Sequence, residues 1–402
     1  MARRAADQLA LDGGARALDN AYMPRPDDRP LRRLPQLAHR KATLERCVFC
    51  PKLCRSACPV SNAEPRETLT PWGKMSMAYF VANESVALAR SFAAPAWACT
   101  GCFGCRDHCD HKNDVTGTLF EARSALVSAG EAPDGAKRVL DSFAERSSVL
   151  GKIATDTRVA SSVDPSGRVA VLVGCEHARQ GTDGGVDTVR AVSRLTGSKV
   201  ALLDVCCGAP LLYAGDQQRF REQGDKVRVA LAGRESLVVG DAGCAAALRV
   251  HHEAAGVRMP VPVLHFAELA AKEVGRLGRL DGSLGRGAVR WHDPCQLGRG
   301  LGVYEAPRQI LSRVLGRAPD EFERRREDAR CSGAGGLLPV TMPDVARGIA
   351  EQRLADHERS GGGTIVTACA SSARSFQKSG QGTVLDLATV VLQALDAADA
   401  AG

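Results

Sequence analysis

Eight of the 15 cysteines of this chain fall into two compact runs, and their spacing is typical of metal-cluster ligands. The first run is Cys47-x2-Cys50-x3-Cys54-x3-Cys58-Pro59, and the second is Cys99-x2-Cys102-x2-Cys105-x3-Cys109. A [4Fe–4S] cluster needs four thiolates that converge on a small volume. Three closely spaced cysteines supply one side of that cage, and a fourth must arrive from elsewhere in the chain. Two such runs therefore predict two [4Fe–4S] clusters.

In two-cluster ferredoxins, the fourth cysteine of each run ligates the cluster of the other run. The same exchange here predicts two ligand sets, which are Cys47, Cys50, Cys54 and Cys109 for one cluster, and Cys99, Cys102, Cys105 and Cys58 for the other. Two departures change the local geometry. Three residues, Pro51 to Leu53, separate Cys50 from Cys54 where two are usual, so we expect a wider turn. Asp110 follows the second run in place of the usual proline.

Zinc and disulfides are the competing explanations for these eight cysteines. Paired C-x2-C elements can bind structural zinc, but each zinc site needs only four ligands, normally as two pairs. Disulfide frameworks belong to short secreted chains, whereas this chain has 402 residues. The spacing favours iron–sulfur clusters, and zinc is the alternative metal.

Length and composition are those of an ordinary globular protein with two or three domains. Apolar residues make up 44% and charged residues 25% of the sequence, and the net charge is +7. This positive charge is spread along the chain and lacks the interleaved aromatic residues of a nucleic-acid groove, so we expect no nucleic-acid partner.

The sequence offers no targeting or membrane signal that we recognise. Arg3-Arg4 is not followed by an apolar stretch, so we predict no export signal. No run approaches the roughly 20 apolar residues that a spanning helix requires. We therefore expect a cytoplasmic protein, where thiols stay reduced, with peripheral membrane association only through a partner.

The stretches around the cysteine runs predict a domain order. Residues 1–46 are rich in Arg, Pro and Asp without a clear period and are expected to form an N-terminal arm that is loosely ordered or wraps a partner. Residues 47–130 predict an α-helical domain that includes a helix from Trp72 to about Arg90. Residues 131–167 contain the turn sequences Pro133-Asp134-Gly135 and 164–167, and are expected to form a linker.

From residue 168 onward the chain repeats one pattern, in which a short apolar strand runs into a cysteine. In the first half, strands predicted at 168–173, 200–203 and 237–239 lead into Cys175, Cys206-Cys207 and Asp241-x2-Cys244, and another lies at 261–264. In the second half, strands predicted at 288–291 and 365–367 lead into Cys295 and Cys369, with Cys331 between them and a last strand at 383–385.

Strands that alternate with helices predict an α/β layer structure in each half. Cysteines at the C-terminal ends of parallel strands converge on one edge of such a sheet. The predicted fold class is therefore α+β and multidomain. It consists of an N-terminal α-helical ferredoxin domain followed by two pseudo-repeated α/β cysteine-rich modules, at residues 168–280 and 281–402.

The order of these motifs resembles a known family. Cys175…Cys206-Cys207-Gly208…Asp241-x2-Cys244 resembles the cysteine-rich "CCG" module of heterodisulfide reductase, and the sequence from His292 to Gly300 is similar to the start of a second module. Related modules occur in the iron–sulfur subunits of anaerobic glycerol-3-phosphate dehydrogenase, glycolate oxidase and lactate-utilisation proteins. The resemblance covers about residues 47–395 and implies a two-cluster helical ferredoxin domain followed by two CCG modules.

The first module departs from the five cysteines that the family offers. Asp241 stands where a cysteine is usual, which leaves Cys175, Cys206, Cys207 and Cys244 with one carboxylate. Asp241 could ligate iron through oxygen, or it could cap the helix that follows. Four cysteines on one sheet edge, together with the resemblance, predict a further iron–sulfur cluster here.

The second module departs further. Ser332 and Ser372 replace cysteines, and only Cys295, Cys331 and Cys369 remain. Three thiolates could hold a smaller cluster or a zinc with water, but a vestigial site explains the serines more simply. His177 and His292 lie near module cysteines, and we expect both to be core or supporting groups.

These features predict an electron-transferring iron–sulfur subunit of an oxidoreductase, with no catalytic residue assigned. Iron–sulfur clusters carry single electrons, so a two-electron reaction needs a flavin or paired clusters. No complete nucleotide-binding motif is present, so we expect a separate partner, either a FAD-containing dehydrogenase subunit, as the resemblance also implies, or another electron-transfer protein. The alternatives are a thiol–disulfide or quinone reductase active at the first module, and a cluster-based redox sensor.

Overall fold

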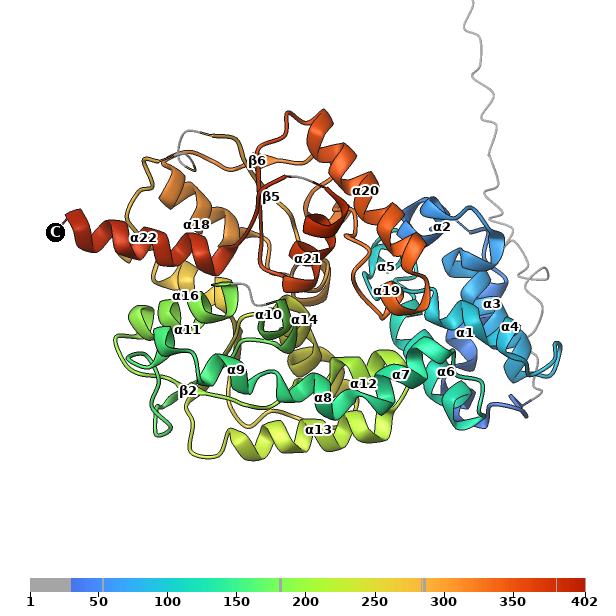
Figure 1. The fold of residues 1–402 in the computed structure, drawn as a ribbon. Coiled ribbons are helices and arrows are strands. Elements are labelled where there is room, and N and C mark those ends of the chain that lie inside the picture. Colours follow the sequence, from blue (N-terminus) through green and yellow to red (C-terminus); the bar gives the residue numbers. More distant parts are fainter. Residues whose placement is uncertain are drawn as a thin grey trace, which may run out of the picture.

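The computed structural model describes residues 30–52, 54–180, 183–282, 284, 287–380 and 382–401. These residues form a helical domain that carries both cysteine runs and two α/β modules that lie one above the other beside it (Figure 1). Residues 1–29, most of the predicted N-terminal arm, lie outside the described residues, as does Leu53 in the first cysteine run.

The helical domain consists of short helices and turns, and its two longest helices begin at polar caps. The Thr70 hydroxyl accepts a hydrogen bond from the N–H of Gly73 (3.0 Å), and the Asp114 carboxylate accepts one from Gly117 (2.9 Å). The elements are η1 (Pro35–Arg40), α1 (Lys41–Val48), η2 (Arg55–Ala57), α2 (Pro59–Ala63), η3 (Glu67–Leu69), α3 (Pro71–Ala82), α4 (Arg90–Ala93), η4 (Ala94–Trp97), α5 (Gly104–Asp107) and α6 (Val115–Ser128).

Two features of this domain differ from the expectations. Residues 30–46 are not a loose arm, because Leu31, Leu34 and Leu37 are buried in the core of the helical domain. The helix predicted from Trp72 to about Arg90 ends at Ala82, and the chain reverses at Glu84, which has a left-handed backbone conformation (φ +70°).

The segment predicted as a linker is a packed connection. Residues 131–167 form α7 (Asp134–Asp141), α8 (Phe143–Ser148), α9 (Gly151–Ala154) and η5 (Thr157–Val159). Val139 of α7 is buried in the core of the helical domain, whereas Ile153 and Val159 are buried in the core of the modules. The connection therefore contributes apolar side chains both to the core of the helical domain and to the core of the modules.

The first module is a parallel four-stranded sheet with helices between its strands, in the order β2-β1-β3-β4. Its strands are β1 (Val169–Leu172), β2 (Ala201–Leu202), β3 (Ser236–Val239) and β4 (Val263–His265). Its helices and turns are α10 (Cys175–Gln180), α11 (Asp183–Thr196), α12 (Ala209–Ala214), α13 (Gln217–Ala230), α14 (Ala242–Ala246), η6 (Ala247–His251), α15 (His252–Ala254), α16 (Phe266–Lys272) and η7 (Val274–Arg276).

The second module repeats this topology with the order β6-β5-β7-β8, again all parallel. Its strands are β5 (Val289–Trp291), β6 (Asp320–Glu321), β7 (Thr364–Thr367) and β8 (Val384–Asp386). Its helices and turns are η8 (Gln296–Gly300), α18 (Glu305–Leu315), η9 (Arg326–Asp328), α19 (Leu338–Thr341), α20 (Pro343–Arg359), α21 (Ala370–Ser379) and α22 (Leu387–Ala401). The predicted fold class is confirmed, and β6 is the strand that the sequence did not predict.

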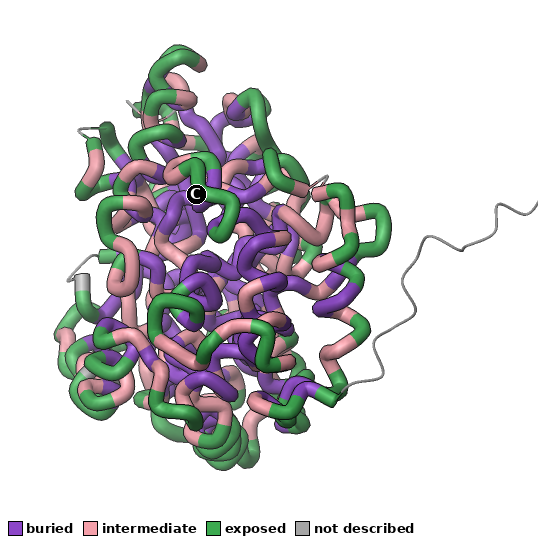
Figure 2. The backbone as a smooth tube through the Cα atoms, turned by 90° about the vertical axis from the view of Figure 1, so that its right-hand side faces the viewer, coloured by how far each residue is buried: buried purple, intermediate pink, exposed green. Residues whose placement is uncertain are grey.

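The two modules share one apolar core, and α11 of the first packs against α22 of the second. Buried residues run through the middle of the molecule while exposed residues line its outside (Figure 2). Among the described residues, no helix is long and apolar enough to span a membrane.

Arg123 on α6 joins the helical domain to the first and the second module. Its side chain is completely buried, and its guanidinium donates hydrogen bonds to the carbonyls of Ala96 (3.0 Å) and Cys99 (2.8 Å) in the helical domain. It also donates to Tyr213 in the first module (2.8 Å) and to Gly336 in the second (3.0 Å). Burial lowers the pKa of Arg123 to about 10, so the group stays charged at neutral pH.

Arg123→Met is expected to lower the free energy of unfolding by at least about 3 kcal/mol, because it leaves four buried carbonyls without a donor. Urea unfolding measures this loss. The matched control is Arg276→Met, whose exposed guanidinium donates to the carbonyl of Leu195 alone (2.6 Å), and which should cost less than about 1 kcal/mol. Equal losses in the two variants would show that Arg123 does not join the domains.

Candidate metal centres

The first predicted ligand set lies at the end of α1. Cys47 occupies the last turn of this helix, and the N–H of Cys50 donates to its carbonyl (3.0 Å). Burial, together with the neighbouring charges of Cys54, Cys109 and Cys50, raises the pKa of Cys47 to about 12. Burial and the charges of Cys50 and Cys109 likewise raise the pKa of Cys54 to about 11. The thiols of Cys50, Cys54 and Cys109 thus lie near enough to Cys47 for their charges to act on it.

The extra residue in the first run is accommodated by a left-handed turn. Lys52 has φ +68°, and its carbonyl accepts a hydrogen bond from the N–H of Arg55 (3.1 Å). The wider turn that the spacing predicts thus carries strain at Lys52, because a side chain other than glycine is disfavoured in this region.

The second predicted set, Cys58, Cys99, Cys102 and Cys105, lines a single cavity in the helical domain. Burial, followed by the charges of Cys99, Cys102 and Cys58, holds the pKa of Cys105 well above its usual range. Cys54 of the first set also contributes to this shift, so the two sets adjoin one another.

A buried lysine enters the same cavity. Lys74 on α3 is 2% exposed, and its Nζ donates to Sγ of Cys58 at 3.3 Å. Burial lowers the pKa of Lys74, but the negative charges of Cys58 and Cys99 outweigh this, and the pKa is raised. No sequence signal distinguishes this lysine from an exposed lysine of an amphipathic helix.

At the first thiol set, the side chain that donates a hydrogen bond to sulfur is uncharged. Nδ2 of Asn113 donates to Sγ of Cys47 (2.9 Å) and to the carbonyl of Thr43 (2.9 Å). The exposed Arg46 donates to the amide oxygen of the same asparagine (3.2 Å). The two thiol sets therefore differ in the charge of the group that touches sulfur.

The residues fit the predicted [4Fe–4S] clusters. Four thiols of the second set surround one cavity, and a buried cation lies against them. Each thiolate of such a cluster binds a different iron, so its ligands stand farther apart than those of a single ion. Within the described part of the chain, no group of three or more His, Cys, Asp or Glu side chains is arranged to hold a single metal ion.

The four cysteines of the first module form a chain of contacts at the C-terminal edge of its sheet. Sγ of Cys207 donates to Sγ of Cys244 at 3.2 Å. Cys206 hydrogen-bonds to Cys207 on one side and to Cys175 on the other. This arrangement follows from the parallel strands, because β1, β2 and β3 each end just before one of these cysteines.

Asp241 caps α14 and reaches into the second module. Its Oδ1 accepts hydrogen bonds from the N–H groups of Gly243 (2.9 Å) and Cys244 (3.2 Å). Its Oδ2 accepts one from the N–H of Ala370 (2.9 Å), which begins α21. Both oxygens are therefore engaged with backbone groups, which matches the capping interpretation of this residue.

Two serines lie among the three cysteines of the second module. Cys331 and Cys102 of the helical domain line one cavity, and the interaction with Cys331 holds the pKa of Cys102 well above its usual range. Burial raises the pKa of Cys369, and the charge of Asp241 in the first module contributes to this shift. The hydroxyls of Ser332 and Ser372 lie 2.8 Å apart.

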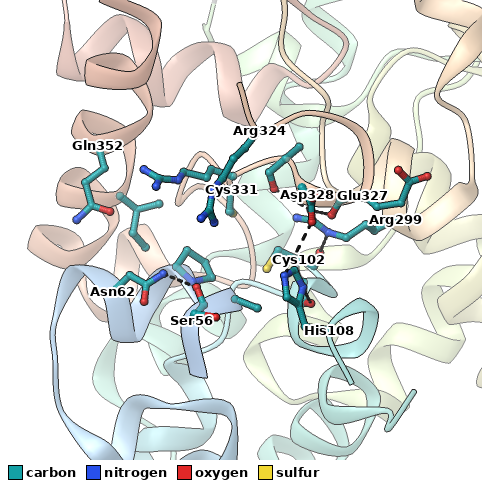
Figure 3. Close-up of a pocket in the computed structure, with 16 residues that line it drawn as sticks. Ser56, Asn62, Cys102, His108, Arg299, Arg324, Glu327, Asp328, Cys331 and Gln352 are labelled. Atoms are coloured by element: carbon teal, nitrogen blue, oxygen red, sulfur yellow. Dashed lines mark hydrogen bonds and ion pairs between the residues drawn. The ribbon is translucent and has the colours of Figure 1, made fainter. Parts of the chain in front are cut away.

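A cavity of about 170 Å³ lies where the helical domain meets the second module, and Cys102 and Cys331 both line it (Figure 3). Arg299 lies beside them and is 7% exposed. Its guanidinium donates to the carbonyls of Cys102 (2.6 Å), Glu327 (2.8 Å) and Ala329 (2.8 Å). Arg299 therefore ties the second module to the second cysteine run.

Tyr213 lies between the thiols of the two modules. Burial holds its pKa well above the usual range, and the charges of Cys207, Cys295 and Cys244 contribute to the shift. Tyr213 therefore lies within the electrostatic reach of cysteines from both modules. No local pattern marks this tyrosine, because its position depends on how the modules pack.

The two histidines that lie near module cysteines act as supporting groups. Nε2 of His177 lies 2.9 Å from Oδ2 of Asp386 at the end of β8, and Nδ1 lies 2.9 Å from the carbonyl of Val173. His292 is completely enclosed, and Arg353 donates to its Nδ1 (3.4 Å). His177 therefore joins the two modules.

Comparison with known proteins identifies the same three regions. A family model described as a 4Fe-4S dicluster domain matches residues 43–113. A second model, described as a cysteine-rich domain, matches twice, at residues 169–249 and 289–375. The chain thus combines a match to the dicluster domain with two later matches to the cysteine-rich domain, in the order that the sequence predicts.

Several curated proteins are similar over most of this chain. One subunit of the fumarate reductase (CoM/CoB) of Methanothermobacter marburgensis is 26% identical over 333 residues, which cover 81% of this chain and 66% of that protein. One subunit of the dihydromethanophenazine:CoB–CoM heterodisulfide reductase of Methanosarcina mazei is 27% identical over 348 residues, which cover 78% of this chain and 83% of that protein.

Lactate utilization protein A of Oceanobacillus iheyensis is 26% identical over 195 residues, which cover 46% of this chain and 78% of that protein. The predicted relationship to heterodisulfide reductase and lactate-utilisation iron–sulfur proteins is therefore confirmed. The chain spans just under two thirds of the length of the fumarate reductase relative.

Asp241→Ala is expected to lower the free energy of unfolding by about 2 kcal/mol, because it removes a helix cap and a hydrogen bond between the modules. Urea unfolding measures this loss, and iron content per chain should stay at the wild-type value under conditions in which the variant is folded. Asp241→Asn keeps one acceptor oxygen and should lose less stability. Loss of iron from a fully folded Asp241→Ala would instead make this carboxylate a metal ligand.

Proposed function

We propose that this chain is the iron–sulfur electron-transfer subunit of an oxidoreductase, and that it passes electrons between a partner dehydrogenase and an acceptor. One observation carries this proposal. The two thiol sets of the helical domain adjoin one another, because Cys54 of the first and Cys58 of the second flank the short turn η2, and Cys102 of the second set lines one cavity with Cys331 of the second module. Thiols from three parts of the chain thus form one continuous series.

The proposed ligands are the two sets described above. Cys47, Cys50, Cys54 and Cys109 would hold one [4Fe–4S] cluster, and Cys58, Cys99, Cys102 and Cys105 would hold the other. When bound, each cluster supplies one-electron transfer. The protein contributes a largely buried setting and hydrogen bonds to sulfur, from Asn113 at Cys47 and from Lys74 at Cys58. Hydrogen bonding and burial are the main means by which a protein tunes such clusters.

The first module would hold a further iron–sulfur cluster. Its four thiols contact one another in sequence, and Cys207 and Cys244 approach to 3.2 Å. For the second module we propose a vestigial metal site, because Ser332 and Ser372 take the places of two cysteines and their hydroxyls hydrogen-bond to each other (2.8 Å). Cys295 and Cys331 still occupy the space between the helical domain and the first module.

The partner would dock where the first thiol set approaches the surface. Cys50, Cys54 and Cys109 are only partly buried, and the side chain of Phe49 beside them is 51% exposed. An exposed aromatic residue next to a redox centre suits a protein partner. We propose a FAD-containing dehydrogenase subunit, or another electron-transfer protein, as that partner. Because the thiolates need a reducing compartment, we also infer a cytoplasmic location.

A second candidate function is thiol–disulfide exchange at the first module. The short distance between Cys207 and Cys244 favours it, because two thiols so close could form a disulfide while a substrate disulfide takes up the two electrons and two protons and becomes two thiols. Iron at this site would exclude a free dithiol. The metal content of the first module therefore separates the two functions.

The anaerobically purified protein is expected to contain about eight irons for the two proposed clusters, and about twelve if the first module also holds one. Cys105→Ala should remove about four irons, because it deletes one ligand of the second set. Colorimetric iron and acid-labile sulfide assays measure both values.

The matched control is Cys369→Ala, which removes an equally enclosed cysteine that lies outside both proposed sets. It should keep the full iron content. Zinc in place of iron in the wild-type protein would contradict the proposed function, and so would an iron content that does not change in Cys105→Ala.

A further inference from the structure

The two thiol sets of the helical domain differ in the charge next to their sulfur atoms. At the second set, the ammonium of Lys74 donates to Sγ of Cys58 (3.3 Å), whereas at the first set a neutral amide, Asn113, donates to Sγ of Cys47 (2.9 Å). Both contacts are buried. This asymmetry has consequences for how readily each site accepts an electron.

The charge of Lys74 is balanced by thiols and not by a carboxylate. Among the described residues, no acidic side chain forms an ion pair with it, and its side chain is 2% exposed, so water screens its charge little. Desolvating an ammonium is costly unless a negative group lies against it. Here the cysteines of the second set are the negative groups, because Lys74 lines the same cavity as all four of them.

Two further buried cations flank the second set. Arg123 donates to the carbonyl of Cys99 (2.8 Å), and Arg299 donates to the carbonyl of Cys102 (2.6 Å). Their charge is shared with several carbonyls, and of these three cations Lys74 is the one that donates to a sulfur atom. At the first set, the arginine that donates to the amide of Asn113 is Arg46, which is exposed and therefore screened by water.

We infer that Lys74 sets the reduction potential of the second set, so that a cluster held by Cys58, Cys99, Cys102 and Cys105 accepts an electron more readily than one held by the first set. This inference rests on the proposed function, because it requires both clusters. Reduction adds one negative charge to a cluster, and a fixed cation at its ligand sulfur stabilises that charge. Asn113 supplies a dipole at the first set and no charge.

The consequence is a direction for electron flow. The first set is closer to the surface, whereas the second adjoins Cys331 and the modules. An electron that arrives from a partner at the first set is therefore drawn inward, and it resides on the side that faces the modules. Lys74 acts on the proposed cluster through its hydrogen bond to Cys58. It is thus a positioning residue, which holds a positive charge beside the ligand sulfur.

The experiment is a redox titration of the holoprotein followed by electron paramagnetic resonance. Wild-type protein should show a one-electron reduction wave for each of the two clusters proposed in the helical domain, and a further wave when the first module also holds a cluster. Lys74→Met removes the positive charge. At a fixed potential, the ratio of reduced to oxidised cluster in the wave of higher potential should therefore fall at least tenfold. Tenfold corresponds to about 59 mV for a one-electron couple. The other wave should stay within a factor of about two.

Three further variants separate charge from packing. Lys74→Gln keeps a donor but removes the charge, and should shift the same wave in the same direction even if Lys74→Met does not fold. Lys74→Arg keeps the charge and should restore the wild-type potential. Lys137→Met removes an exposed lysine from α7 and should move neither wave, because its charge is screened.

The outcomes distinguish a failure of the proposed function from a failure of the role inferred for Lys74. A wild-type protein without two reduction waves would contradict the proposed function, whatever Lys74 does. Two waves that do not move in Lys74→Met and Lys74→Gln would contradict the role of Lys74 alone. A shift in Lys74→Arg as large as the shift in Lys74→Met would likewise show that the packing of this side chain, and not its charge, sets the reduction potential.

Discussion

One buried guanidinium ties together the three parts of the structure that carry the thiols. Arg123 leaves α6 and donates to carbonyls of the helical domain, of α12 in the first module, and of the loop before α19 in the second. A buried charge must satisfy its donors, and here the acceptors come from three separate parts of the chain. The three parts therefore cannot shift relative to one another without leaving a charged group unpaired. One of its acceptors, the carbonyl of Cys99, belongs to the second thiol set.

Electrostatics link this junction to the metal chemistry. Lys74, Arg123 and Arg299 are all buried beside the second cysteine run, and burial without compensation would cost several kcal/mol for each cation. Backbone carbonyls compensate the two arginines, whereas Lys74 relies on Sγ of Cys58. Ligand thiolates and cations thus stabilise one another. Because metal ligands must be deprotonated, loading of the proposed cluster would be coupled to the folding of this region.

Much of the architecture could be predicted because its signals are local. The cysteine spacing identifies the dicluster domain, and short apolar runs locate seven of the eight strands. Strand β6 escaped prediction because it consists of Asp320 and Glu321, whose place in the sheet depends on tertiary contacts. Glu321 is paired with Arg308, which also makes a bidentate contact with the buried Asp293. No propensity argument from two acidic residues predicts a strand.

The candidate site was predictable in its ligand types and not in its surroundings. Spacing indicates that Cys58 belongs with the second run, but it says nothing of the lysine that touches its sulfur. Asp241 illustrates the same limit, because ligand and helix cap were both open interpretations of the sequence. Only the position of Ala370, more than a hundred residues away in the chain, shows how both carboxylate oxygens are used.

The second module explains why a site can lose cysteines while its fold persists. Ser332 and Ser372 stand where the family has cysteines, and their hydroxyls lie 2.8 Å apart in a buried hydrogen bond. This bond gives each of the two buried hydroxyl groups a hydrogen-bond partner within the protein. The sheet does not depend on them, because β5 and β7 are held by backbone pairing and a shared apolar core. Selection could therefore relax at Ser332 and Ser372 while Cys295 and Cys331 stayed between the helical domain and the first module. In the proposed function, the module would serve as a spacer that fixes the distance between two redox sites, a role that requires its fold and not a metal.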